Sequence, residues 1–435
     1  MDENRVREYL QSVYDSEIPA LVNRDLLLPD TSKIVTLIGP RRAGKTYLMY
    51  QKIKELLAKG VYKNNILYIN CEHPWLSSVD FKELYDVVKM HWRLYPPKEK
   101  NFYLFIDEPQ VITQWESAVR MFHDEGMNIF LSGSSSKLLS KEIATSLRGR
   151  SISYLVLPFS FKEYLRLREF NEDTERLGGK NKSLLMHHLD EYTQLGGYPE
   201  IIKESDPLMK ERIINDYFEL IVFKDIIDRY KIKNTKLVKW LINACIISAS
   251  SELSVHKTYL DLKSRGLKAS KNTLYSYLSL LEDSLMIFIV SKYSYSVKKI
   301  NPLINKIYID DTCFFKRVDS SKNVGKKMEN MVYLELMRRK KPLANIHYYK
   351  NVQGEEVDFV ITEGNRVMQL IQVCQKLDDI ETKQREIRAL LKASVELKCK
   401  NLMIITEDHQ GIENAEWFGN KGKIEYIPIW KWLLE

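Results

Sequence analysis

The stretch that decides the fold is Gly39-Pro40-Arg41-Arg42-Ala43-Gly44-Lys45-Thr46, which has the spacing G-x-x-x-x-G-K-T. A β-rich run at 33–38 precedes it and a helical pattern at 45–57 follows it. A glycine-rich turn in this context lets backbone N–H groups surround phosphate oxygens, and the helix N-terminus adds its positive end. We therefore predict a nucleotide site formed by these residues and Tyr47. The alternative is a chance glycine-rich turn.

Two side chains of the loop have chemical roles of their own. Lys45 can reach the β- and γ-phosphates, and the Thr46 hydroxyl can bind Mg²⁺. The expected cofactors are therefore ATP and Mg²⁺.

The second half of such a site is an acid at the end of a buried strand. The run Phe102-Tyr-Leu-Phe-Ile-Asp107-Glu108 supplies two. We expect Asp107 to hold Mg²⁺ through water and Glu108 to polarise the attacking water as general base. The alternative is a solvated loop after the strand.

Polar residues after the next strand extend the prediction. Ser132 and Ser134 are candidates to sense the γ-phosphate; the alternative is a turn or a helix cap. Arg148 and Arg150 follow on a short polar connection, and an arginine from the same or a neighbouring subunit can stabilise transition-state charge. Otherwise they are ordinary surface arginines.

Alternating strands and helices define the organisation of the chain. Strand-like runs at 33–38, 66–70, 103–106 and 129–132 alternate with amphipathic stretches, which favours a parallel sheet covered on both faces. Residues 160–230 are mainly helical by pattern, and the remainder mixes helices with β-rich runs. We predict four domains: an ATPase core (1–158), a helical lid (159–232), a helix–turn–helix module (233–318) and a C-terminal α/β domain (319–435).

Composition limits the protein class. No stretch reaches the roughly 20 apolar residues of a membrane span, and the N-terminus has no apolar signal region. The five cysteines are scattered and never spaced C-x-x-C, which argues against disulfides and zinc. We expect a cytoplasmic protein.

Positive charge is concentrated in one segment. Between Lys231 and Asp310 stand thirteen basic and five acidic residues, a surplus of +8 that equals the net charge of the whole chain. Residues 254–265 and 271–281 form a helix–turn–helix pattern broken at Gly266, and β-rich runs follow, as in a winged helix. Such a module binds DNA, or it docks a protein or another subunit. The candidate DNA contacts are Lys257, Lys268, Lys271, Asn272, Lys292, Lys298 and Lys299.

Several motifs together resemble a known family. Besides the loop at 39–46 they are Phe105-Ile-Asp-Glu-Pro-Gln110, Leu131-Ser-Gly-Ser-Ser135, Leu147-Arg-Gly-Arg150, Leu157-Pro-Phe-Ser-Phe-Lys-Glu-Tyr164, Leu195-Gly-Gly-Tyr-Pro-Glu200, Glu329-Asn330 and Glu356-Val-Asp-Phe-Val360. The sequence resembles the prokaryotic AAA+ ATPases, common in archaea, that carry a C-terminal domain of unknown function. The resemblance implies a three-layer P-loop core, a helical lid, a winged-helix module and a C-terminal domain similar to the PD-(D/E)xK nucleases.

The nuclease-like chemistry is incomplete in this chain. Such a site needs a helix Glu, an Asp on a strand and an acid-x-Lys on the next strand, which together bind a divalent metal and assist water. Glu329 and Asp358 fit the first two positions, but Gln372 and Cys374 stand at the third. Lys376 could replace the missing lysine if the strand continues. We expect a retained scaffold without nuclease activity.

These observations favour an AAA+ ATPase that binds and remodels DNA and that forms a ring if an arginine acts between subunits. The first alternative is a nucleotide-controlled switch with a protein partner. The second is an ATP-dependent DNA nuclease.

Overall fold

The computed structural model describes residues 2–76, 79–134, 147, 149–170, 178–294, 304–318, 323–377 and 379–435. The chain forms two compact units. Unit 1 covers the chain up to Leu157 together with Asp283–Leu285, and unit 2 covers Pro158–Glu282 and Met286–Glu435. Among the helices in the described ranges, none has both the length and the apolar character that a membrane span requires. All five cysteines are buried and unpaired with one another.

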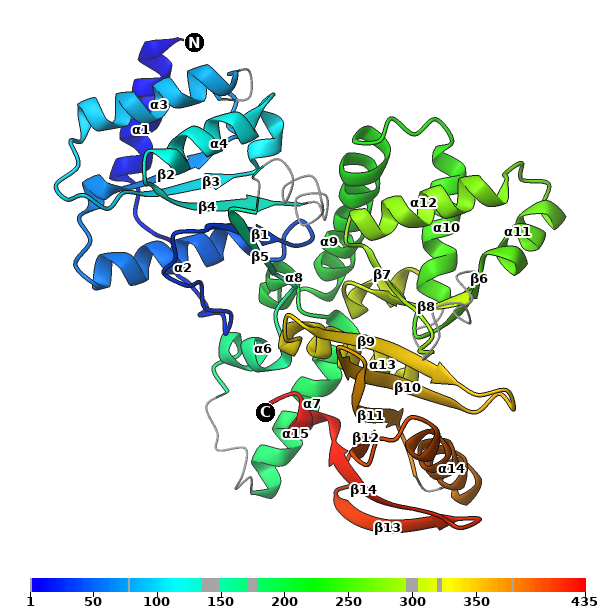
Figure 1. Cartoon of the computed structure of the whole chain (residues 1–435). Coiled ribbons are helices and arrows are strands. Elements are labelled where there is room, and N and C mark those ends of the chain that lie inside the picture. Colours follow the sequence, from blue (N-terminus) through cyan, green and yellow to red (C-terminus); the bar gives the residue numbers. More distant parts are fainter. Residues whose placement is uncertain are drawn as a thin grey trace. The chain divides into compact units, whose positions relative to one another are not determined.

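Unit 1 is a five-stranded parallel sheet in the order β2-β3-β4-β1-β5. Helix α2 lies on one face, and α1, α3 and α4 lie on the other (Figure 1). The predicted parallel sheet with helices on both faces is confirmed. The elements are α1 (Glu3–Asp15), β1 (Ile34–Ile38), α2 (Lys45–Ala58), β2 (Ile66–Asn70), α3 (Phe81–Leu94), β3 (Tyr103–Asp107), α4 (Trp115–Asp124), β4 (Asn128–Gly133) and β5 (Ser151–Leu155), with 3₁₀ turns at Lys63–Asn65 and Pro109–Val111.

The register of the sheet brings the predicted site residues to one edge. β1 is buried at every position, and Ile38, its last residue, pairs with Gly133 of β4. Asp107, the last residue of β3, lies level with Asn70 on one side and Ser132 on the other. Because all five strands are parallel, the loop at 39–46, Asp107 and Ser132 share the carboxyl edge, where ligands bind in open α/β sheets.

Unit 2 begins with helices and continues into a small three-stranded module. One apolar core runs from Leu195 to Val318 and joins the two parts. The module has the element order helix, strand, helix, helix, strand, strand, and its sheet is antiparallel in the order β6-β8-β7. The elements are α6 (Phe161–Leu167), α7 (Gly179–Leu195), α8 (Pro199–Lys203), α9 (Pro207–Leu220), a π-helix (Ile221–Asp228), α10 (Thr235–Ile247), β6 (Ser251–Ser254), α11 (Val255–Ser264), α12 (Lys271–Asp283), β7 (Ile287–Val290), β8 (Ile304–Ile309) and a 3₁₀ turn (Thr312–Arg317).

Local sequence explains the turn between α11 and α12. Gly266 takes a positive φ of 71° after α11, a conformation that glycine adopts without steric cost. The Ser270 hydroxyl then accepts the Thr273 N–H at 3.1 Å and caps α12. Leu274, Leu278 and Leu281 form the buried face of α12. The helix–turn–helix predicted for 254–284 is therefore present.

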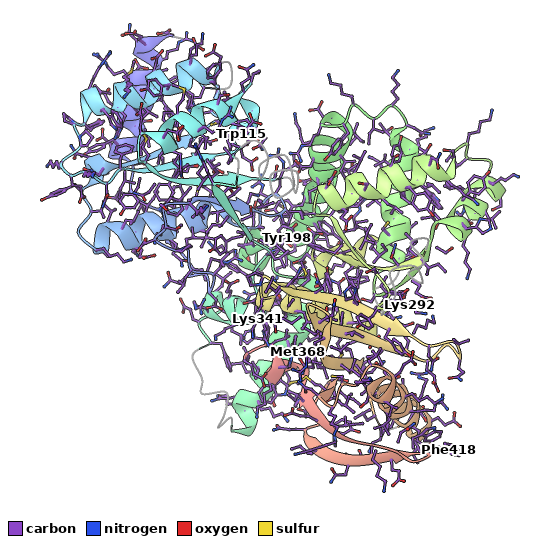
Figure 2. The ribbon with its side chains drawn as sticks, in the orientation of Figure 1. Trp115, Tyr198, Lys292, Lys341, Met368 and Phe418 are labelled. Atoms are coloured by element: carbon purple, nitrogen blue, oxygen red, sulfur yellow. The ribbon has the colours of Figure 1, made fainter. Side chains whose placement is uncertain are left out.

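The C-terminal part of unit 2 is a six-stranded mixed sheet in the order β13-β14-β12-β11-β10-β9. The strands β9, β10 and β11 are antiparallel neighbours, and β11, β12 and β14 run parallel. Phe418, which is 90% exposed, stands at the tip of the β13–β14 hairpin (Figure 2). The elements are α13 (Val324–Arg339), β9 (Ala344–Lys350), β10 (Glu356–Glu363), β11 (Arg366–Cys374), α14 (Ile380–Glu396), β12 (Leu402–Thr406), β13 (Gly411–Trp417), β14 (Asn420–Pro428) and α15 (Ile429–Trp432).

Candidate active site

The backbone of the loop at 39–46 is shaped for an anion. Gly44 has φ 95° and precedes α2, so a residue with a side chain would be strained there. A Cβ on Gly39 would lie 1.9 Å from the Val156 carbonyl oxygen, so only glycine fits beside β5. Arg42 also has a positive φ, 66°. The two glycines therefore allow the loop to turn tightly at the N-terminus of α2, where backbone N–H groups can bind phosphate.

Lys45 lies inside the loop. Its side chain is buried, and its Nζ donates to the carbonyl oxygens of Gly39 and Pro40, both at 2.9 Å. Glu108 Oε1 is 4.0 Å from the same Nζ. An ammonium held within a phosphate-binding loop is placed to neutralise phosphate oxygens.

Asp107 is the centre of a hydrogen-bonded cluster. Its Oδ2 accepts the Thr46 hydroxyl at 2.6 Å and the Tyr68 hydroxyl at 2.8 Å, and its Oδ1 contacts the Ser132 hydroxyl. Burial and the Asp107 charge raise the pKa of Tyr68 well above its ordinary value, so Tyr68 stays a donor. A hydroxyl beside a carboxylate fits Mg²⁺, which is usually bound by one or two such protein oxygens together with waters and substrate phosphates.

Glu108 is held in an unusual conformation next to this cluster. It has φ 52° and ψ 49°, the left-handed region that few residues other than glycine adopt, and it is buried. Its Oε2 accepts the N–H and the hydroxyl of Ser134, both at 3.3 Å, and it contacts the Gln110 amide. Strained backbone of this kind persists where the surroundings fix it, often at functional sites.

Two residues of the site have no signal in the sequence. Tyr68 reaches Asp107 from β2, and Arg24 supports the loop from a segment without regular structure. Arg24 is buried; its Nη1 donates to Ala43 O at 2.8 Å and its Nη2 to Leu157 O at 2.7 Å. It therefore ties the phosphate loop to the chain beyond β5. A buried arginine between two segments is recognised only when both are placed in space.

The remaining predicted residues of this site lie at its rim or away from it. Arg41 pairs with Glu72 at 3.3 Å, and Tyr47 is 48% exposed on α2. Arg150 precedes β5, beside the start of β1, and its Nη1 pairs with Asp124 at 2.7 Å. The five residues of β5, at about 3.3 Å each, separate Arg150 from the carboxyl edge. The structure therefore does not bring Arg150 to the phosphate loop of its own chain. Arg148 lies outside the described residues.

Four of the seven predicted DNA contacts belong to α11, to α12 or to the turn between them. Lys257, Lys268, Lys271 and Asn272 are exposed on or between α11 and α12. Lys292 is half-buried and forms a bridge to Tyr348 of β9; Figure 2 labels it. Lys298 and Lys299 lie outside the described residues. Lys306, which the charge count includes, is buried and ion-paired, so it contributes nothing to a basic surface.

The residues of the predicted nuclease-like site also meet. Asp358 on β10 pairs across the sheet with Gln372 on β11, because Phe359 faces Ile371 in an antiparallel register. Gln372 donates to Glu386 at 2.6 Å and accepts the Asp358 N–H at 3.2 Å. β11 ends at Cys374, and Lys376 beyond it is exposed, so the strand does not continue to Lys376, which was the condition under which Lys376 could replace the missing lysine. The lysine that contacts Glu329 and Asp358 is Lys306, from β8.

Comparison with known proteins finds matching domain families and relatives for this chain. Residues 31–165 match the model of an AAA domain, and 186–322 and 324–432 match two domains of unknown function (DUF8612 and DUF4143). The chain is 38% identical over 419 residues to the uncharacterized protein MJ1544 of Methanocaldococcus jannaschii, covering 95% of this chain and 91% of that protein. An uncharacterized protein of Haemophilus influenzae is 29% identical over 346 residues, which are 78% of this chain and 82% of that protein.

Among solved structures, the Walker-type ATPase PABY2304 of Pyrococcus abyssi aligns over 72% of this chain and 95% of its own, with 16% identity and a TM-score of 0.44. That TM-score is too low for the likeness to carry an argument. The sequence match to MJ1544 extends over nearly the whole of both chains and carries more weight. The chain therefore belongs to the same family as MJ1544, and residues 31–165 are its AAA domain.

Proposed function

We propose that the chain hydrolyses ATP with Mg²⁺ at the carboxyl edge of the unit 1 sheet. The observation that carries this proposal is the 2.6 Å contact between Thr46 and Asp107, with Glu108 and Lys45 beside it. The bound Mg²⁺ supplies positive charge that neutralises the phosphates, and Thr46 and Asp107 would hold it. Lys45 binds phosphate oxygens, and Glu108 accepts the proton of the attacking water.

The two serines have supporting roles in this proposal. Ser132 fixes one oxygen of Asp107, and Ser134 fixes one oxygen of Glu108 through both its hydroxyl and its N–H. Either residue would report a change at the γ-phosphate to β4. An arginine that completes the site, Arg148 or Arg150, would come from the same chain or from another copy, and in the second case the protein forms a ring or another homo-oligomer.

We further propose that the partner is DNA and that hydrolysis remodels it. The element order of residues 235–309 and the β6-β8-β7 sheet support this proposal, because they agree with a winged helix in which α12 would be the recognition helix. A hollow of about 610 Å³ lies at the turn before α12, lined among others by Lys263, Lys268 and Ser270. Exposed ammonium groups around such a hollow favour phosphate contact. We keep the divisions at 158, 232 and 318 as the proposed domain boundaries and the cytoplasm as the proposed location.

A protein partner is the rival, and one observation favours it. Leu260 on α11 is 49% exposed, and Leu267 in the turn is 36% exposed. Exposed apolar side chains beside the same helices suit a protein surface better than a phosphate backbone. In this reading, hydrolysis is a slow timer and the module docks a protein.

The decisive experiment measures steady-state ATPase rate with Mg²⁺, with and without single-stranded, duplex and branched DNA. Glu108→Gln keeps the size of the side chain but removes the base, so we expect kcat to fall about 10²–10⁴-fold while nucleotide still binds. We expect DNA to raise the wild-type rate several-fold. Hydrolysis that survives Glu108→Gln contradicts the site, whereas hydrolysis that needs Glu108 but ignores every DNA favours the protein-regulated switch.

A further inference from the structure

One lysine stands at the centre of three carboxylates in unit 2. Lys306 Nζ lies 2.9 Å from Glu329 Oε1, 2.9 Å from Asp358 Oδ1 and 2.6 Å from Glu356 Oε1. The lysine comes from β8 of the three-stranded module, Glu329 comes from α13, and the other two acids come from β10. The Lys306 side chain is 1% exposed, so water does not compete for these contacts.

The geometry is that of a cation site filled by an ammonium. Three oxygens from two elements converge on one atom, and an ammonium has three N–H donors, one for each oxygen. The Tyr308 hydroxyl donates to Glu329 at 2.7 Å, and the Val373 N–H donates to the second oxygen of Asp358 at 2.9 Å. At the rim, Lys350 pairs with Glu356 at 3.3 Å and with Glu252 at 2.8 Å. The whole cluster is therefore hydrogen-bonded without a metal.

Electrostatics hold the cluster in this state. The Lys306 ammonium lies within 2.9 Å of one oxygen of each of three carboxylates, and these opposite charges favour its charged form. Removing one member of such a buried group is strongly destabilising because it leaves uncompensated charge.

The site expected for a divalent metal does not fit one. The element order α13-β9-β10-β11-α14-β12 agrees with the nuclease-like fold that the sequence predicts, and this fold implies a metal at Glu329 and Asp358. Gln372, at the third ligand position, is engaged with Glu386 and the Asp358 N–H. With the Lys306 ammonium between Glu329, Glu356 and Asp358, no group of three or more His, Cys, Asp or Glu side chains within the described residues is arranged to hold a metal ion.

We propose that Lys306 is a built-in replacement for a divalent cation: its ammonium occupies the point between Glu329, Glu356 and Asp358, so the C-terminal domain is independent of metal, and removing the ammonium recreates a cation site. The inference is independent of ATP hydrolysis, because every residue in it belongs to unit 2.

The test is thermal unfolding of the full chain without nucleotide, in EDTA and in a titration of Mn²⁺ or Ca²⁺. Lys306→Met keeps the length of the side chain but removes the charge. We expect this variant to melt earlier than wild type in EDTA. Its Tm should then rise by roughly 5–10 °C when the cation exceeds its Kd about 100-fold. Wild-type Tm should be the same in EDTA and in Mn²⁺.

Two control variants separate this site from others. Lys350→Met removes a lysine that also contacts Glu356 but leaves Lys306 in place, so it should show no cation response. The double variant Lys306→Met with Asp358→Asn should lose the response of the single variant. A rise in Tm that survives Asp358→Asn, or no rise in Lys306→Met, overturns the proposal.

If Lys306→Met does not fold, a comparison of wild type with variants of Asp358 also tests the proposal. Tb³⁺ luminescence excited through tyrosine reports a lanthanide close to Tyr308. We expect wild type to show no Tb³⁺ emission that disappears in Asp358→Asn. Emission lost in Asp358→Asn, or Mn²⁺-dependent DNA cleavage lost in Asp358→Ala, shows that wild type binds metal here and overturns the proposal.

Discussion

Arg24 illustrates how single residues position the nucleotide site without touching a ligand. Its guanidinium donates to Ala43 O inside the phosphate loop and to Leu157 O beyond β5. The planar guanidinium carries several N–H donors in fixed directions, so it can donate to two carbonyl oxygens at once. A lysine ammonium cannot bind both oxygens in the same way. Arg24 is therefore a positioning residue.

Arg24→Met should loosen the loop. It leaves two buried carbonyl oxygens without this donor, at a cost of about 1–3 kcal/mol each. We expect ATP affinity to fall about tenfold or more, with KM raised more than kcat is lowered, as measured by nucleotide titration and steady-state kinetics. Arg5→Met, at an arginine whose side chain is 64% exposed, is the control. Unchanged affinity and Tm in Arg24→Met would refute the role.

At the scale of residues, the sequence predicts the contacts that its recognisable motifs make with one another. It predicts that Thr46 and Asp107 meet, because a phosphate loop and an acid at the end of a buried strand share one edge of a parallel sheet. It does not predict Tyr68, because that tyrosine lies on β2 with no pattern that distinguishes it from other half-buried strand residues. It leaves open whether Arg150 acts in its own chain, in a neighbouring one or as a surface arginine, and only the fold places it at the start of β5, away from the phosphate loop of its own chain.

At the scale of elements, α3 carries a buried histidine. His91 is 1% exposed, and its Nε2 lies 3.4 Å from Asn64 O. Burial lowers its pKa from 6.5 to about 4. The folded protein thus keeps His91 neutral where the unfolded chain binds a proton. Its contribution to stability is fully present above pH 6.5 and is lost as the pH falls toward 4.

His91→Phe should remove this acid sensitivity. The shift corresponds to roughly 3 kcal/mol at about 1.36 kcal/mol per pKa unit. Urea unfolding across this pH range measures the free energy of unfolding of wild type and of the variant. The difference between these two free energies should change by roughly that amount, and the variant should gain stability relative to wild type as the pH falls. His187→Phe, at an exposed histidine of α7, should show no such change. Parallel pH curves for wild type and His91→Phe would contradict the argument.

The sequence predicts long periodic elements better than peripheral ones. Strands β1 to β4 and helices α10 to α13 follow clear apolar patterns, and the structure has them; β5, with the sequence SISYL, has no such pattern. The pattern does not assign α1, α14 or the β13–β14 hairpin. In β13 only Ala415 is buried, so the strand lacks the apolar alternation by which strands are recognised.

At the scale of the whole molecule, the charge surplus predicts how binding depends on salt. A lysine that contacts a DNA phosphate displaces a counterion from the DNA. Each such lysine therefore makes the slope of log affinity against log salt concentration steeper by about one unit. Replacing Lys257, Lys268 and Lys271 together by alanine should weaken duplex binding and flatten the slope by up to about three units. Fluorescence anisotropy at several salt concentrations measures both.

The matched control replaces Lys341, Lys400 and Lys423, which are exposed in the C-terminal part; Figure 2 labels Lys341. It changes the net charge equally, so only the loss of specific contacts distinguishes the two triple variants. Equal slopes in both would mean that DNA does not use the α11–α12 surface. Charge counting alone cannot make this distinction, since it includes Lys306, which the fold buries.

The burial of Lys306 has a consequence for inheritance. A fragment that begins at residue 319, where the sequence predicts a domain boundary, carries Glu329, Glu356 and Asp358 but leaves their counter-charge behind on β8. Such a fragment keeps Lys350, which pairs with Glu356, but loses the ammonium that lies between the three acids. We therefore expect β8 and the C-terminal part to be inherited together, because a gene boundary between them would separate Lys306 from its three acids.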